Sequence, residues 1–450
     1  MFYAILFVKI LYEKLLKKGW ALMIKRNLSF YITSSHPDYK TVKQQAAQAR
    51  RLYNTLNKLK HEKSELYKNT AAQTPVANSL NIDLTKSYSE AWRKPIEQAQ
   101  SIVLPQKVAQ HVGKQCDEAW VSVIKKRAQG LKTGDPKYKH KYAELRFTKQ
   151  AIAQSKKVHK KNILIPSGWK NGVQLPEEIK LIQVESAVLI PRPDGFELKV
   201  LYVKDLVQQP FNKEDDNTVY ASGDLGLNKL ITIITTEGSR PKTVDGKSLK
   251  SINRFFNKKI SSLKSLRDKT NDNNEGGEKE RLNKTIQRLW FKREKQINHF
   301  LNAASNEIVK YLLQKGVQCF VIGWSKGFKN EINLGRKNNQ NFASIPHGKF
   351  RDLLIRKCAE AGIRTIVQEE SYTSKASFID NDSLPVYSKS NLAKHRFSGH
   401  RVKRGEYVSR NGSRIHADVN AAWNILRKCK PSIGWCSGVV AYPENLRIVV

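Results

Sequence analysis

Three carboxylates in this chain occupy positions from which they could act together on a phosphate ester. Asp224 ends a short apolar run, and Glu370 follows a second one. Asp418 lies just inside a helical pattern. Carboxylate oxygens are hard ligands that suit magnesium, and two such ions roughly 4 Å apart can activate a water and stabilise a leaving oxygen. The spacing is therefore typical of a metal-dependent nuclease, although an Asp-x-Gly after a strand also occurs in ordinary hairpin turns.

The elements that must position these acids can be predicted from the residues beside them. Val219 to Asp224 alternates in the manner of a strand, and Gly223 leaves the backbone beside the acid uncluttered. A second strand is predicted from Arg364 to Val367, just before Glu369 and Glu370. Asp418 begins a helix whose small residues Ala421 and Ala422 can press closely on a sheet. The order resembles that of an RNase H-like nuclease fold.

The composition points to a polyanionic partner. Lys and Arg number 80 against 40 Asp and Glu, which gives a formal net charge of +40 over 450 residues. A protein with this charge repels itself, whereas nucleic acid releases counterions on binding it. The alternative is a membrane surface, but the apolar opening before Trp20 is too short to span a bilayer and has no cleavage site. We expect no membrane partner.

The cysteines form no paired framework and no CxxC motif, which favours a reducing compartment and argues against a cysteine-based zinc site. They are Cys116, Cys319, Cys358, Cys429 and Cys436.

Changes between helical and strand patterns along the sequence divide the chain into segments. We expect an extension or misread start over 1–22, because Met23 precedes a plausible first strand. Strand patterns over 23–40 and 162–215 predict a small β-barrel, and 41–161 predicts a helical lobe inserted within it. An α/β nuclease domain is expected over 216–430, with a helical hairpin at 251–316. The residues 431–450 would form a C-terminal tail.

The three acid motifs resemble a known family. In order, Gly223 to Lys229, Glu370 to Lys375 and Asp418 to Ile425 are similar to the three RuvC motifs of the TnpB proteins, transposon-encoded RNA-guided endonucleases related to type V CRISPR effectors. The block from Val321 to Leu354 resembles the segment that these proteins carry between their first two motifs. The earlier barrel and helical lobe resemble the family's wedge and recognition domains in arrangement.

The resemblance implies a function and a set of partners. Asp224, Glu370 and Asp418 match the family's catalytic and metal-binding acids, which hold two Mg²⁺ ions, or Mn²⁺ in their place. Glu369 precedes Glu370, and on a strand its side chain would point to the face opposite that of Glu370. The partners would be a guide RNA from the transposon end and double-stranded target DNA, in a bacterial cytoplasm or nucleoid. Such an enzyme supports transposon maintenance, whereas recombination would need a separate transposase.

One departure from the family concerns zinc. Many members carry a four-cysteine zinc ribbon between the second and third motifs, but 376–415 contains no cysteine here. Two histidines, His395 and His400, are a poor structural zinc site without further soft ligands. We therefore expect a basic loop that contacts nucleic acid, and no zinc.

Two other functions stay open at this stage. The chain could be an RNA-guided DNA-binding protein with weak or no cleavage, and the altered segment before Asp418 keeps that reading open. It could also be a transposase that acts without RNA, which predicts activity in protein purified free of RNA.

Overall fold

The structure is a computed structural model that describes ten stretches of the chain: 22–66, 89–153, 156–206, 218–226, 228–270, 277–324, 345–387, 395–403, 405–433 and 441–448. The chain divides into two compact units: one runs from Met23 to Asp205, and the other comprises Leu206–Val450 together with Met1–Leu22. The N-terminal extension and the tip of the helical hairpin, both expected from the sequence, lie outside the described residues.

The first unit contains a four-stranded sheet in the order β1-β6-β5-β2. Its strands are β1 (Leu22–Ile32), β2 (Leu145–Thr148), β5 (Val184–Arg192) and β6 (Gly195–Leu206). Gly195 makes the tight β5–β6 turn possible: a Cβ there would lie 2.4 Å from the carbonyl oxygen of Ile32. β1 and β2 stay at opposite edges, so the described strands form an open sheet and the closed barrel we expected is not formed among them.

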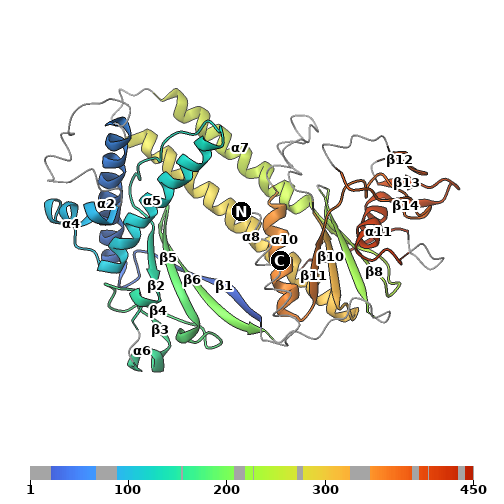
Figure 1. The fold of residues 1–450 in the computed structure, drawn as a ribbon, viewed down its shortest axis with the longest axis horizontal. Helices are drawn as coiled ribbons and strands as arrows, with labels where there is room; N and C mark the ends of the chain where they lie inside the picture. Colours follow the sequence, from blue (N-terminus) through green and yellow to red (C-terminus); the bar gives the residue numbers. More distant parts are fainter. Residues whose placement is uncertain are drawn as a thin grey trace. The chain divides into compact units, whose positions relative to one another are not determined.

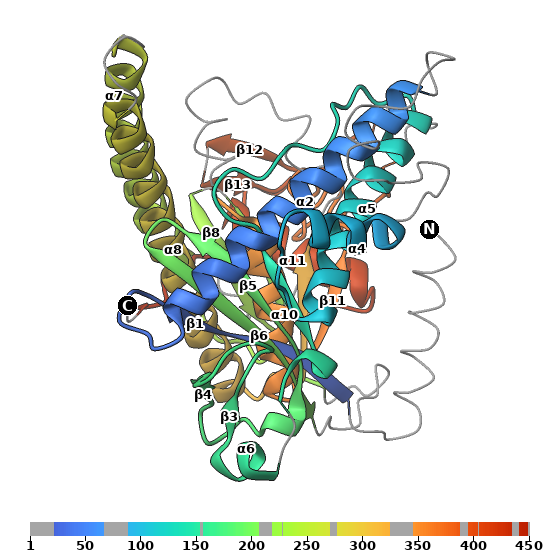
Figure 2. The same ribbon diagram turned by 90° about the vertical axis from the view of Figure 1, so that its left-hand side faces the viewer.

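Helices that precede β2 in the chain share a core with this sheet. They are α2 (Tyr39–Leu66), α4 (Ser89–Ala99) and α5 (Gln106–Ala128), and Figure 2 shows α4 and α5 beside α2. Trp92 and Leu56 from the helices and Phe147 from β2 belong to one buried cluster. Smaller elements complete the unit: α6 (Lys156–Lys161) and the two-stranded pair β3 (Ile163–Leu164) and β4 (Val173–Gln174).

The second unit is built on a six-stranded sheet in the order β11-β10-β7-β8-β9-β15. The strands are β7 (Tyr220–Leu225), β8 (Lys229–Thr235), β9 (Lys242–Asp245), β10 (Cys319–Gly323), β11 (Arg364–Gln368) and β15 (Glu444–Asn445). β7, β8 and β9 are antiparallel neighbours, whereas β10 runs parallel to both β7 and β11. Three antiparallel strands followed by two parallel ones are the arrangement expected for an RNase H-like fold.

Helices cover both faces of this sheet. α8 (Gly277–Gln314) and α10 (His347–Glu360) pack on one face through a cluster that includes Phe300, Phe350 and Phe320. α11 (Ala417–Cys429) packs on the other face with Tyr220 and Val321, and Figure 1 shows β10 and β11 between α10 and α11. α7 (Lys247–Lys269) runs alongside α8 and completes the expected hairpin.

Two segments differ from the sequence-based expectation. The described part of 376–415, predicted to be a basic loop, contributes to a three-stranded antiparallel sheet made of β12 (His400–Lys403), β13 (Glu406–Val408) and β14 (Arg414–His416). The predicted C-terminal tail supplies β15, which extends the main sheet beside β9. The sequence pattern does not reveal these strands. β12, β13 and β14 are only three or four residues long, and β15 has two residues and pairs with a strand far away in the sequence.

A bilayer-spanning helix would have to be long and nearly free of charge, and none of the helices in the described stretches meets both conditions.

Candidate functional site

Strand register brings two of the predicted acids to one edge of the sheet. Gly223 on β7 pairs with Ile322 on β10, so the next residue, Asp224, lies level with Gly323. Gly323 in turn pairs with Gln368 at the end of β11, two residues before Glu370. Since β7, β10 and β11 are parallel, their carboxyl ends meet at this edge.

The third acid, Asp418, belongs to α11, and this helix packs closely on the sheet. The hydroxyl of Ser222 donates to the backbone oxygen of Ala422 at 2.8 Å, a contact that the small side chain of alanine permits. The absence of a side chain at Gly323 leaves space for the side chains of Ile425 and Glu370. A Cβ at Gly323 would lie 2.5 Å from Cδ1 of Ile425 and 2.9 Å from Oε2 of Glu370. Asp418 is the second residue of α11, and the N-cap of this helix is His416, whose Nδ1 accepts from the N–H of Asp418 at 3.3 Å.

The charges of the three acids act on one another. The pKa of Asp224 is well above its ordinary value, first because the carboxyl is withdrawn from water, then because Asp418 and Glu370 add negative charge nearby. The structure therefore brings all three predicted site residues into one electrostatic cluster.

Arg401 of β12 is a member of this cluster that the sequence did not single out. Its guanidinium lies 3.5 Å from Oδ1 of Asp418, and its charge lowers the pKa of Asp224. The basic run around it was visible in the sequence, but nothing there indicated which arginine would reach the acids.

Glu369 points toward different partners. Its carboxylate accepts from Lys428 at 2.8 Å and from the N–H of Ser371 at 2.6 Å. Burial raises the pKa of Glu369, but the hydrogen bonds from Lys428 and Ser371 outweigh it and leave the pKa below its ordinary value. This carboxylate is thus held by Lys428 in the last turn of α11 and by the turn at Ser371.

The donors suit a divalent cation in chemistry, since all three are carboxylates and a cation would relieve their mutual repulsion. Within the described stretches, no three acidic, histidine or cysteine side chains come close enough together to hold an ion as they stand. The three carboxylates therefore suit a divalent cation in their chemistry, but ligation would require the side chains to turn toward one another.

Hydrogen bonds and ring contacts hold the described part of 376–415. Asp382 accepts from the backbone N–H groups of Ser377 and Ser398 at 2.8 and 3.0 Å. Tyr407 is buried, and its hydroxyl donates to the backbone oxygen of Lys375 at 2.8 Å. His395 packs edge-on against Tyr372, with ring centroids 5.0 Å apart, whereas His400 lies in strand β12.

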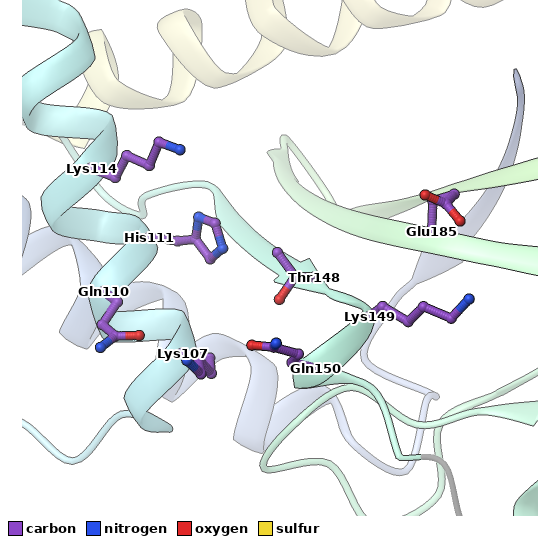
Figure 3. A pocket seen from close by; sticks show the side chains of 8 residues that line it. All are labelled: Lys107, Gln110, His111, Lys114, Thr148, Lys149, Gln150 and Glu185. Atoms are coloured by element: carbon purple, nitrogen blue, oxygen red, sulfur yellow. The ribbon is translucent and has the colours of Figure 1, made fainter.

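A basic pocket of about 520 Å³ lies within the first unit. Figure 3 shows Lys107, His111 and Lys114 on α5 across from Thr148 and Gln150, whereas the side chain of Lys149 points away from α5. Glu185 of β5 is the one acid in the lining. Burial and then the charge of Lys114 lower the pKa of His111, so its ring is neutral at pH 7. The pocket combines positive charge with hydrogen-bonding groups, which suits a phosphate-bearing ligand.

Two family models match the chain. One, described as a probable transposase, matches residues 201–326 and so includes Asp224. The other, described as the TNB domain of Cas12f1-like proteins, matches residues 347–425 and includes Glu370 and Asp418.

The chain is also similar to known proteins. The TnpB-like protein ORF457 of Acidianus two-tailed virus is 25% identical over 210 residues, which are 46% of this chain and 41% of that protein. The match therefore spans less than half of the curated relative. Among solved structures, a complex of Cas12f1 with sgRNA and target DNA has 15% identity and a TM-score of 0.47, over 86% of this chain and 82% of that one. A binary complex of AacC2c1 with sgRNA has 10% identity and a TM-score of 0.32, over 86% and 70%.

Proposed function

Because this chain belongs to the TnpB family of transposon-associated nucleases related to Cas12, we propose that it is an RNA-guided DNA endonuclease that cuts at the Asp224, Glu370 and Asp418 cluster. The observation that carries the proposal is the convergence of these acids. Two come from the carboxyl ends of β7 and β11, the parallel strands on either side of β10, and the third comes from the first turn of the helix packed against this sheet.

The three carboxylates would hold two Mg²⁺ ions, or Mn²⁺ in their place, and bound there the ions would supply an activated water and stabilise the leaving oxygen. The chain's own residues prepare this site. The half-buried position of Asp224 keeps bulk water away from the carboxylates and strengthens their interaction with a cation. Arg401 opposes the mutual repulsion of the acids and partly offsets the rise in the pKa of Asp224. It is also placed to meet a DNA phosphate beside Asp418.

The unit from Met23 to Asp205 would act as the wedge and recognition domains and hold a guide RNA derived from the transposon end. The charge of +40 supports long contacts with a phosphate backbone. We assign Lys107, Lys114 and Lys149 of the basic pocket to such contacts, because its lining has three cations and one acid. Sequence would then be read chiefly by base pairing between guide and target.

A second candidate is an RNA-guided DNA-binding protein that cuts poorly. The contact between Arg401 and Asp418 favours it, since a guanidinium at that carboxylate competes with a cation for the same oxygens. Guided binding without cleavage would select this function.

The neighbouring glutamates provide a matched test of the proposed site. In guided cleavage assays with magnesium, E370Q should abolish cutting, whereas E369Q removes the same charge one residue away and should retain it. Guided binding of target DNA should survive in both. Equal loss of cleavage in the two variants, or full activity of E370Q, would contradict the assignment.

A further inference from the structure

Two buried asparagines of α11 connect this helix to the turn that follows Glu370. Asn420 and Asn424 are four residues apart, so both face the same segment, and both are fully buried. Asn424 donates from Nδ2 to the backbone oxygens of Thr373 and Ala376, at 2.9 and 2.8 Å. Asn420 donates to the Ala376 oxygen at 2.8 Å and accepts from the N–H of Phe378 at 2.9 Å.

Of these hydrogen bonds, the one from Asn424 to Thr373 connects α11 to Glu370. The hydroxyl of Thr373 donates to the backbone oxygen of Glu370 at 2.9 Å, and its N–H does so at 3.3 Å. A continuous path therefore runs from Asn424 through Thr373 to the backbone of Glu370. Asn424 lies on the same helix as Asp418, so the path joins the elements that carry two of the acids.

The turn between them needs this support. It has no regular secondary structure. Tyr372 in this turn has a backbone φ of 62°, which residues other than glycine rarely adopt. A turn of this kind keeps its shape only when its surroundings determine it. The amide of Asn424 supplies that constraint from inside the protein, where a lost hydrogen bond is not replaced by water.

We propose that Asn424 is a positioning residue that, through Thr373, fixes the backbone of Glu370 relative to the helix that carries Asp418, so that the two carboxylates can turn to share a divalent cation. This inference rests on the proposed nuclease site. Asn420 anchors the same segment farther along and acts on its stability. The two asparagines therefore differ in role although they are equally buried.

The test is a titration of the full-length chain with Mn²⁺, in which binding is taken as the part that D224A removes. N424A should weaken that binding roughly tenfold or more, the usual effect of losing a group that orients a metal ligand. N420A is the matched control: its thermal midpoint should also fall, but its Mn²⁺ affinity should stay within about twofold of the wild type.

Thr373→Val gives an independent reading, because it removes the hydroxyl donor and keeps the shape of the side chain. It should weaken Mn²⁺ binding as well, and combining it with N424A should cost less than the sum of the two effects. If N424A does not fold, T373V alone decides. The same readout applies to cleavage: the half-activating Mg²⁺ concentration should rise while guided DNA binding is unchanged.

The outcomes separate this inference from the proposed function. Unchanged Mn²⁺ affinity in N424A or T373V, or equal weakening in N420A, overturns the positioning role while the nuclease site stands. A wild-type chain without any Mn²⁺ binding that D224A removes would overturn the nuclease site itself.

Discussion

Gly323 offers a sharp test of how α11 meets the sheet. An added Cβ would lie 2.5 Å from Cδ1 of Ile425, well inside contact distance, and Ile425 is fully buried with little room to move. Overpacking of this kind typically costs about 1–3 kcal/mol. For a unit of this size each kcal/mol lowers the thermal midpoint by roughly 2–4 °C, so G323A should lower it by about 2–12 °C.

The substitution should also reduce cleavage, because the same Cβ would lie 2.9 Å from Oε2 of Glu370 and push that carboxylate aside. The assay is thermal unfolding by circular dichroism, with guided cleavage measured in parallel. G134A is the matched control, since a Cβ at Gly134 meets no atom within 4 Å.

Ile425→Val supplies the compensating change, because it removes the methyl group that the new Cβ would meet. The double variant G323A/I425V should be destabilised by less than the sum of the two single variants. Strict additivity, or a G323A variant as stable as G134A, would refute the close packing of α11 on β10.

Three further predictions concern parts of the chain away from this contact. Burial raises the pKa of Asp38, but N–H groups from Gly172 and its neighbours outweigh it, so the pKa is lowered from 3.8. The stabilisation is fully present above the unfolded-state pKa and is lost as the pH falls through the lowered pKa; D38N should thus be less stable than wild type at pH 7, and the difference in stability should shrink as the pH falls below 3.8. Lys428→Met should destabilise by about 1–3 kcal/mol, measured by urea unfolding, because the buried Lys428 ammonium donates to the partly exposed carboxylate of Glu369 and to the backbone oxygen of Ser371, and both hydrogen bonds are lost. A zinc chelator should leave the thermal midpoint unchanged, whereas Asp382→Asn should lower it; a chelator-induced drop would show that zinc supports the β12–β14 sheet.

Sequence reasoning succeeded where local pattern and fold agree. Alternation from Val219 to Asp224 predicted a strand, and in β7 Tyr220 and Ser222 do face α11 while Ala221 faces the opposite cluster. A glycine just after a helical run typically ends the helix, and Gly362 follows α10 with a φ of 76°. In both cases the determining contacts lie within a few residues or repeat at a fixed period.

The remaining features depend on contacts between distant residues. Arg401 lies 17 positions before Asp418, and no periodicity links them. The path from Asn424 to Thr373 spans 51 positions and requires a turn whose shape no propensity predicts. β15 is two residues long and pairs with a strand about 200 positions earlier, so it has no sequence signal of its own.

The central claim is that this chain cuts DNA under RNA guidance at the three-carboxylate site. The most direct measurement is to express the chain with its flanking DNA, sequence the RNA that co-purifies, and incubate the complex with magnesium and a randomised target library. We predict a discrete RNA and cleavage of matching targets that disappears in D224A. Cleavage that needs no RNA, or that persists in D224A, would contradict the account.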